Sequence, residues 1–146
     1  MIISASRRTD IPALYTPLFM ERIREGYCLV PNPYNRKQVS RVSLAPAEAE
    51  VIVFWTRDPR PLLPHLAELD QRGYRYYFRF TLTGYAAPLE PNLPPVADLL
   101  ASFLALARQV GPQRALWRYD PILLSGLTEV DYHLRRFREL AATLSG

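Results

Sequence analysis

Arginine stands beside a hydroxyl or a carboxylate side chain in four short stretches of this sequence, each at the end of a run typical of a β-strand. A guanidinium group can bind carboxylate or phosphate through two parallel hydrogen bonds. If the strands are parallel neighbours, their carboxyl ends meet at one edge of the sheet, where ligands of parallel α/β folds bind. The stretches therefore predict a site for a small anionic ligand. The candidate ligand-binding residues are Arg7, Arg8, Asp10, Thr56, Arg57, Asp58, Arg79, Thr81, Thr83, Glu90, Arg118 and Asp120.

Each residue type in this set has an expected role. The arginines would hold the anion, the hydroxyls would orient it, and the aspartates would orient the arginines. Arg79 alternates with apolar neighbours and shares a strand face with Thr81. If that face points into a barrel, Arg79 needs a charged partner, with Asp120 or Glu90 as the candidates. No residue is a convincing general base, so no catalytic residue is assigned.

A simpler interpretation exists for the aspartates. Asp58-Pro59 and Asp120-Pro121 are typical of turns and helix N-caps, in which the carboxylate accepts backbone N–H groups, and Asp10 precedes Pro12 in the same way. For each aspartate alone, capping is the better interpretation. For the whole set, with an arginine beside each aspartate, a binding site is favoured.

Few other residues suggest chemistry. Cys28 is the only cysteine, which excludes an intrachain disulfide and fits a cytoplasmic protein. Because Cys28 lies near an apolar strand, we expect its thiol to be buried and inert. His65 and His133 fall within amphipathic helical patterns and are expected at the surface. No metal-ligand spacing is present, so no metal is expected. No run of eighteen apolar residues exists, which excludes a membrane-spanning segment.

Strand and helix patterns alternate along the chain and predict one α/β domain over residues 1–146. Two extended pieces at 27–30 and 39–43 indicate a hairpin inserted after the first helix. Helical crossovers imply parallel strands, and the absence of a glycine-rich nucleotide loop favours a partial (β/α) barrel over a doubly wound sheet. The expected strands are 2–5, 51–55, 75–83 and 115–119, and the expected helix starts are Thr16, Pro61, Pro94 and a capping-box pattern at Thr128.

Four strand–helix units are half of an eight-unit barrel and leave two sheet edges open. We therefore expect self-association, or pairing with a complementary second chain. Apolar side chains that face the barrel, such as Phe78 or Phe80, should be partly uncovered.

The net charge of +4 comes from arginine, since Lys37 is the only lysine. A GC-rich genome explains this bias without a ligand. A nucleic-acid-binding domain is an alternative, but the arginines are spread over helices and strand ends and not lined along one helix, which argues against it. A barrel enzyme acting on a sugar phosphate is a second alternative. It would require a general base or a metal triad, and neither is visible.

Five stretches occur in the same order in one protein family: IISASRRTDIPA, NPYNRKQVSRVSL, VIVFWTRDP, FTLTGY followed by LEPNLP, and LWRYDPI. With these motifs the chain resembles the uncharacterised bacterial proteins called domain of unknown function 1848. Members of that family are similar to radical S-adenosylmethionine enzymes through a cysteine cluster near their C-terminus, and they are longer. The resemblance implies that this chain is the N-terminal half, that it holds no cofactor itself, and that an iron–sulfur cluster and S-adenosylmethionine would require a C-terminal half.

Overall fold

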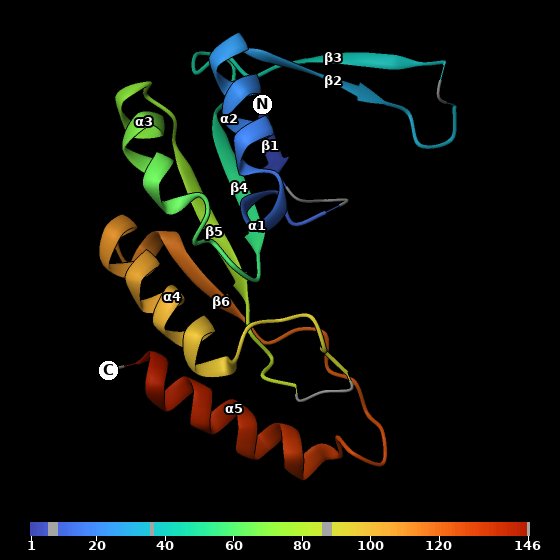
Figure 1. Ribbon diagram of the computed structural model, residues 1–146, viewed down its shortest axis with the longest axis vertical. Coiled ribbons are helices and arrows are strands. Elements are labelled where there is room, and N and C mark those ends of the chain that lie inside the picture. The colour runs from blue at the N-terminus through green and yellow to red at the C-terminus, as the bar shows by residue number, and fades with distance from the viewer. Residues whose placement is uncertain (6–8, 36, 86–88, 146) are drawn as a thin grey trace.

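Four parallel strands form the main sheet, in the order β1-β4-β5-β6 (Figure 1). The computed structural model describes residues 1–5, 9–35, 37–85 and 89–145. Of the two central strands, β4 is a nearly continuous apolar run, as expected where a strand is buried on both faces, whereas β5 alternates between buried and half-buried residues. The bounds are β1 (Ile2–Ala5), β4 (Val51–Thr56), β5 (Tyr76–Thr81) and β6 (Ala115–Arg118).

Helices connect these strands, and most begin where the sequence predicts. The helix expected from Pro61 is the exception, because it begins only at Leu66 after a short 3-10 turn. Pro64 lies in between, and proline lacks the N–H group that a helix interior requires. The bounds are α1 (Ile11–Leu14), α2 (Thr16–Glu25), η1 (Leu63–His65), α3 (Leu66–Gln71), α4 (Val96–Val110), η2 (Pro112–Arg114) and α5 (Val130–Leu144).

One face of the main sheet packs against helices α2 and α4. The rings of Phe54 and Phe19 lie 5.4 Å apart between centroids, and those of Phe80 and Phe103 lie 5.2 Å apart. Phe78 and Phe80 are fully buried on this face. The expectation that they face a barrel and stay partly uncovered is therefore wrong, because the alternation of β5 turns them toward the helices.

The opposite face of the sheet carries the polar residues of β5. Arg79 pairs in register with Trp55 of β4 and Leu116 of β6, and Thr81 pairs with Arg118. These side chains are half-buried, except that Leu116 is 40% exposed. Alternation along the strand thus separates an apolar helix-covered face from a polar face.

The second sheet is an antiparallel hairpin of β2 (Tyr27–Pro31) and β3 (Val39–Ser43) that projects from the main body (Figure 1). It confirms the hairpin expected after the first long helix. The fold is therefore mixed α/β, with a parallel four-stranded sheet and a separate hairpin. No helix among the described residues has both the length and the apolar character needed to cross a bilayer.

Candidate functional site

A pocket of about 610 Å³ opens at the carboxyl ends of the parallel strands. Every strand of the main sheet contributes to its lining, as expected for the ligand-binding edge of a parallel sheet. Each of the four predicted arginine-bearing stretches contributes at least one lining residue. The lining residues are Ser4, Asp10, Trp55, Thr56, Arg57, Thr81 and Arg118.

Two arginines lie against the indole ring of Trp55. The guanidinium carbons of Arg79 and Arg118 are 4.7 and 4.6 Å from the ring centroid. Such contacts hold a guanidinium by its flat face and leave the N–H groups in its plane available to an acceptor. Trp55 is therefore a wall of the site, whereas Trp117 packs in the core and donates its indole N–H to the carbonyl of Leu82 over 2.9 Å.

Arg79 has no charged partner within the part of the chain that the structure describes. Its Nε is the one buried side-chain nitrogen or oxygen among the described residues that has no hydrogen-bond partner. The expected partners are engaged elsewhere: Glu90 pairs with Arg57, and Asp120 pairs with Arg118. A buried N–H without an acceptor costs about 1–3 kcal/mol, so a group that bonded this Nε would stabilise the folded chain.

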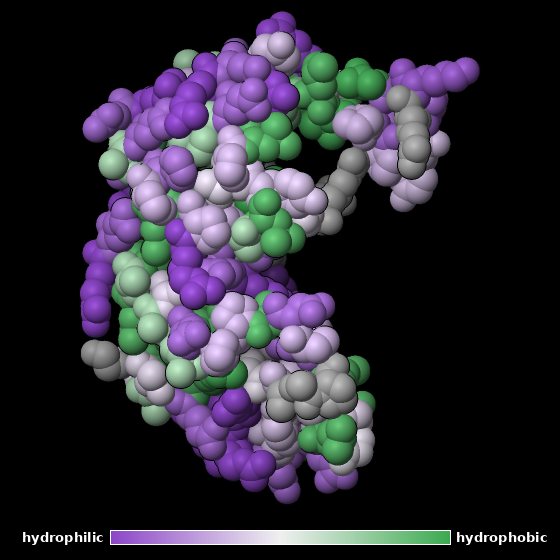
Figure 2. Space-filling model, viewed as in Figure 1, coloured by the Kyte–Doolittle hydropathy of each residue, from purple (hydrophilic) through white to green (hydrophobic). Residues whose placement is uncertain are grey.

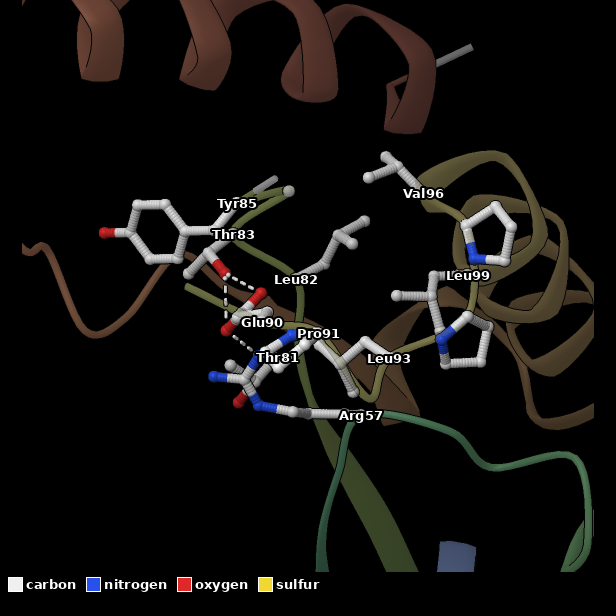
Figure 3. A pocket seen from close by; sticks show the side chains of 13 residues that line it. Arg57, Thr81, Leu82, Thr83, Tyr85, Glu90, Pro91, Leu93, Val96 and Leu99 are labelled. Carbon is white, nitrogen blue, oxygen red and sulfur yellow. Dashed lines mark hydrogen bonds and ion pairs between the residues drawn. The ribbon is translucent and has the colours of Figure 1, made fainter. Parts of the chain in front are cut away.

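Arg57 is held at both its backbone and its side chain. Its N–H donates to Oδ2 of Asp10 over 2.7 Å, and its guanidinium forms an ion pair with Glu90. Thr83 donates its hydroxyl to Oε2 of the same glutamate over 3.1 Å. Figure 3 shows Arg57, Thr83 and Glu90 converging in an adjoining pocket of about 300 Å³, which shares Arg57 and Thr81 with the larger one.

The aspartates divide between the two interpretations. Asp10 accepts the N–H of Ala13 and caps α1, so capping is confirmed there. Asp58 accepts the N–H of Arg60 over 3.1 Å and pairs with that side chain, so it orients Arg60 and not Arg57. Partial burial acts to raise the pKa of Asp58, but the bonds from Arg60 outweigh it and lower the pKa. Of the four carboxylates, Asp120 and Glu90 do orient arginines of the site.

The remaining candidates take no part in the arginine contacts described above. Arg7 and Arg8 lie outside the described residues. Thr56 is buried and accepts the N–H of Asp58 over 3.0 Å through its hydroxyl, although it lines the pocket. Cys28 is a free, half-buried thiol, and burial raises its pKa against the opposing charge of Arg22. No group of three possible metal ligands occurs among the described residues.

His133 is a residue whose environment the sequence prediction missed. The amphipathic pattern of α5 places it at the surface, but it is only 6% exposed. Its imidazole lies among the rings of Tyr85, Tyr119 and Tyr132. Tyr132 directly precedes it in the sequence, but nothing in the sequence shows that the two more distant tyrosines meet it.

Comparison with known proteins gives one finding. The family model described as Domain of unknown function (DUF1848) matches residues 2–146. Searches of curated proteins and of solved structures returned no match. Because the family model covers nearly the whole chain and agrees with the ordered motifs at the strand ends, this chain belongs to the DUF1848 family.

Proposed function

We propose that this chain is an anion-binding domain whose arginines, at the carboxyl ends of β4, β5 and β6, hold a carboxylate or phosphate group. The observation that carries the proposal is the buried Nε of Arg79, which has no acceptor. A bound anion would supply that acceptor. Trp55 holds the guanidinium in place without neutralising it.

The charge balance of the site supports this function. Arg57 and Arg118 each pair with one carboxylate, whereas Arg79 pairs with none of the described carboxylates. Without a ligand, the site therefore keeps one positive charge that no described carboxylate neutralises, on the indole ring that Arg118 also contacts. A singly charged group bound at Arg79 would neutralise this charge, and the hydroxyl of Thr81 could orient it.

The arrangement of the sheet supports a partial (β/α) barrel with the site at its mouth. Helices α2 and α4 pack on one face through Phe19 and Phe103, and the polar residues lie on the other. In a radical S-adenosylmethionine-like enzyme, such a domain would contribute arginines that bind substrate or cofactor. One cysteine and no metal-ligand group among the described residues do not fit an iron–sulfur cluster, so no catalytic step is assigned to this chain.

Titration with inorganic phosphate, followed by calorimetry, tests the proposal. We expect Arg118→Gln to weaken binding, because a bidentate arginine–anion contact contributes about 1.5–3 kcal/mol, or roughly tenfold to more than a hundredfold in affinity. Arg108→Gln is the matched control, since it removes the same charge from an exposed position in α4. Equal affinities in both variants would rule out the site.

A further inference from the structure

The imidazole of His133 joins the end of β6 to the segment that follows it. The ring lies on α5, and its Nδ1 is 2.8 Å from the hydroxyl oxygen of Tyr119. Its Nε2 is 2.9 Å from the carbonyl oxygen of Leu123. Tyr119 directly follows Arg118, the arginine that β6 contributes to the anion site. One buried side chain thus contacts both the strand end and the segment 120–128.

The partners of the ring define its tautomer. A carbonyl oxygen only accepts hydrogen bonds, so Nε2 must carry a proton to bond Leu123. In the neutral ring Nδ1 is then an acceptor, and the hydroxyl of Tyr119 donates to it. Burial, together with Tyr85 and Tyr132, raises the pKa of Tyr119 to about 12 against the opposing effect of Arg136, so this hydroxyl keeps its proton.

Further hydrogen bonds fix the segment at the same residue. The hydroxyl of Tyr85 donates to the carbonyl of Pro121 and accepts the N–H of Leu123, both over 2.8 Å. Thr128 donates its hydroxyl to the carbonyl of Leu123 over 2.6 Å. This bond replaces the capping box expected at Thr128, and no side chain caps α5. Both backbone groups of Leu123 are therefore held by side chains.

Two contacts of Arg118, one from its backbone and one from its side chain, hold the end of β6 in place. The carbonyl of Arg118 accepts the N–H of Leu82 over 3.0 Å, and its guanidinium pairs with Asp120. We infer that His133 is a positioning residue, whose Nε2-protonated ring ties Tyr119 to Leu123 and thereby holds Arg118 at the anion site. The effect on binding rests on the proposed function, whereas the link between Tyr119 and Leu123 does not.

Aromatic packing alone is the competing explanation. Edge-to-face contacts surround the ring, with centroids 5.8, 5.8 and 5.3 Å from those of Tyr85, Tyr119 and Tyr132. Two substitutions separate the possibilities. His133→Phe keeps a flat ring but removes both hydrogen bonds. His133→Gln loses the ring but keeps an N–H donor that can reach the carbonyl of Leu123.

Amide hydrogen exchange in the protein without added phosphate tests the link directly. The N–H of Leu123 donates to the hydroxyl of Tyr85, so its exchange rate reports how firmly the segment is held. We expect this N–H to exchange about fivefold faster in His133→Phe, because losing the imidazole bond to the Leu123 carbonyl loosens the segment by about the free energy of one hydrogen bond. The rate should return toward that of wild type in His133→Gln. The ¹⁵N spectrum of the wild-type ring should show Nε2 protonated. The inference would be overturned if the Leu123 N–H in His133→Phe exchanged at the wild-type rate, or if the wild-type imidazole carried its proton on Nδ1 alone.

A milder pair of variants covers the case in which His133→Phe does not fold. Tyr119→Phe removes the hydroxyl that bonds the imidazole, whereas Tyr132→Phe removes a neighbouring hydroxyl that does not. Only Tyr119→Phe should accelerate the exchange of the Leu123 N–H. The same substitution should weaken phosphate binding by about fivefold, which is also the effect expected on exchange. Faster exchange with unchanged phosphate affinity would overturn the positioning role. If the wild-type protein bound no phosphate, the proposed function would be overturned. The exchange rate of the Leu123 amide would still test whether His133 links Tyr119 to Leu123.

Discussion

Arg57, Arg79 and Arg118 differ in the group that neutralises the charge of each side chain. Arg57 has Glu90 and Arg118 has Asp120, so each brings its own counter-charge to the pocket. Among the described residues, Arg79 contacts the face of Trp55 and no carboxylate, and an aromatic face attracts a cation without cancelling its charge. At the residue scale, the proposed binding of an anion would therefore depend most on Arg79.

Glu68 gives a residue-scale prediction about acid stability. It accepts hydrogen bonds from Arg24 over 2.9 and 2.6 Å and from Arg72 over 3.0 Å. The bond from Arg24 is the largest cause that lowers its pKa from 4.5 to about 2. Because the folded pKa is depressed, this carboxylate stabilises the fold above pH 4.5, and the contribution is lost as the pH falls toward 2.

Urea denaturation at several pH values measures this effect. Glu68→Gln should be less stable than wild type at neutral pH, and the difference should shrink below pH 4.5. Glu21→Gln, an exposed position on α2, serves as the control and should show no such pH dependence. A difference between Glu68→Gln and wild type that stays constant down to acid pH would contradict the assignment.

At the element scale, Asp10 joins helix α1 to strand β4. One carboxylate oxygen caps the helix through the N–H of Ala13, and the other accepts the N–H of Arg57 at the strand end. The position of the Arg57 backbone thus depends on Asp10, a residue that the sequence identifies as both a helix cap and a candidate ligand. One carboxylate thus bridges the start of α1 and the residue that follows β4.

Asp10→Ala should destabilise the domain by about 1–3 kcal/mol, because it removes a helix cap and leaves a backbone N–H without its acceptor. Asp10→Asn keeps one oxygen acceptor and should lose less. Chemical denaturation of the three proteins checks the order of stability. A stability of Asp10→Ala equal to that of wild type would show that water replaces both bonds.

The elements themselves were largely predictable, whereas their contacts were not. The strands at Ile2 and Val51 were found because apolar runs mark buried strands, and the turn residues between 31 and 39 predict the hairpin. Local sequence does not encode which carboxylate reaches which arginine. Glu90 meets Arg57 because the chain after β5 returns to the end of β4, and His133 is buried because distant tyrosines surround it.

At the scale of the whole molecule, both edges of the main sheet carry exposed apolar residues. A largely apolar groove of about 580 Å³ lies beside β1, where Ile2 is 64% exposed. On the side of β6, Leu116 of the strand and Leu134 of α5 are exposed. Figure 2 shows hydrophobic side chains gathered where the hairpin leaves the body of the molecule, beside a hollow in its outline. Exposed apolar surface of this kind is typical of interaction sites.

We expect the chain to self-associate through these edges, and sedimentation velocity over a range of concentrations measures it. Ile2→Lys should weaken association, because a lysine on an edge strand opposes pairing with another chain. Tyr34→Lys introduces the same charge at the exposed end of the hairpin and should have no effect. A stable, monodisperse wild-type monomer would contradict the expectation.

Thermal unfolding with and without inorganic phosphate tests the anion site most directly, using wild type, Arg79→Gln and the control Arg108→Gln. Without phosphate, Arg79→Gln should unfold at the wild-type temperature or higher, because it removes a buried N–H donor that has no acceptor among the described residues. With phosphate, wild type and Arg108→Gln should be stabilised by ligand binding to the folded state, and Arg79→Gln should lose the shift. Equal phosphate-induced shifts in all three proteins would contradict the assignment of Arg79 to an anion site.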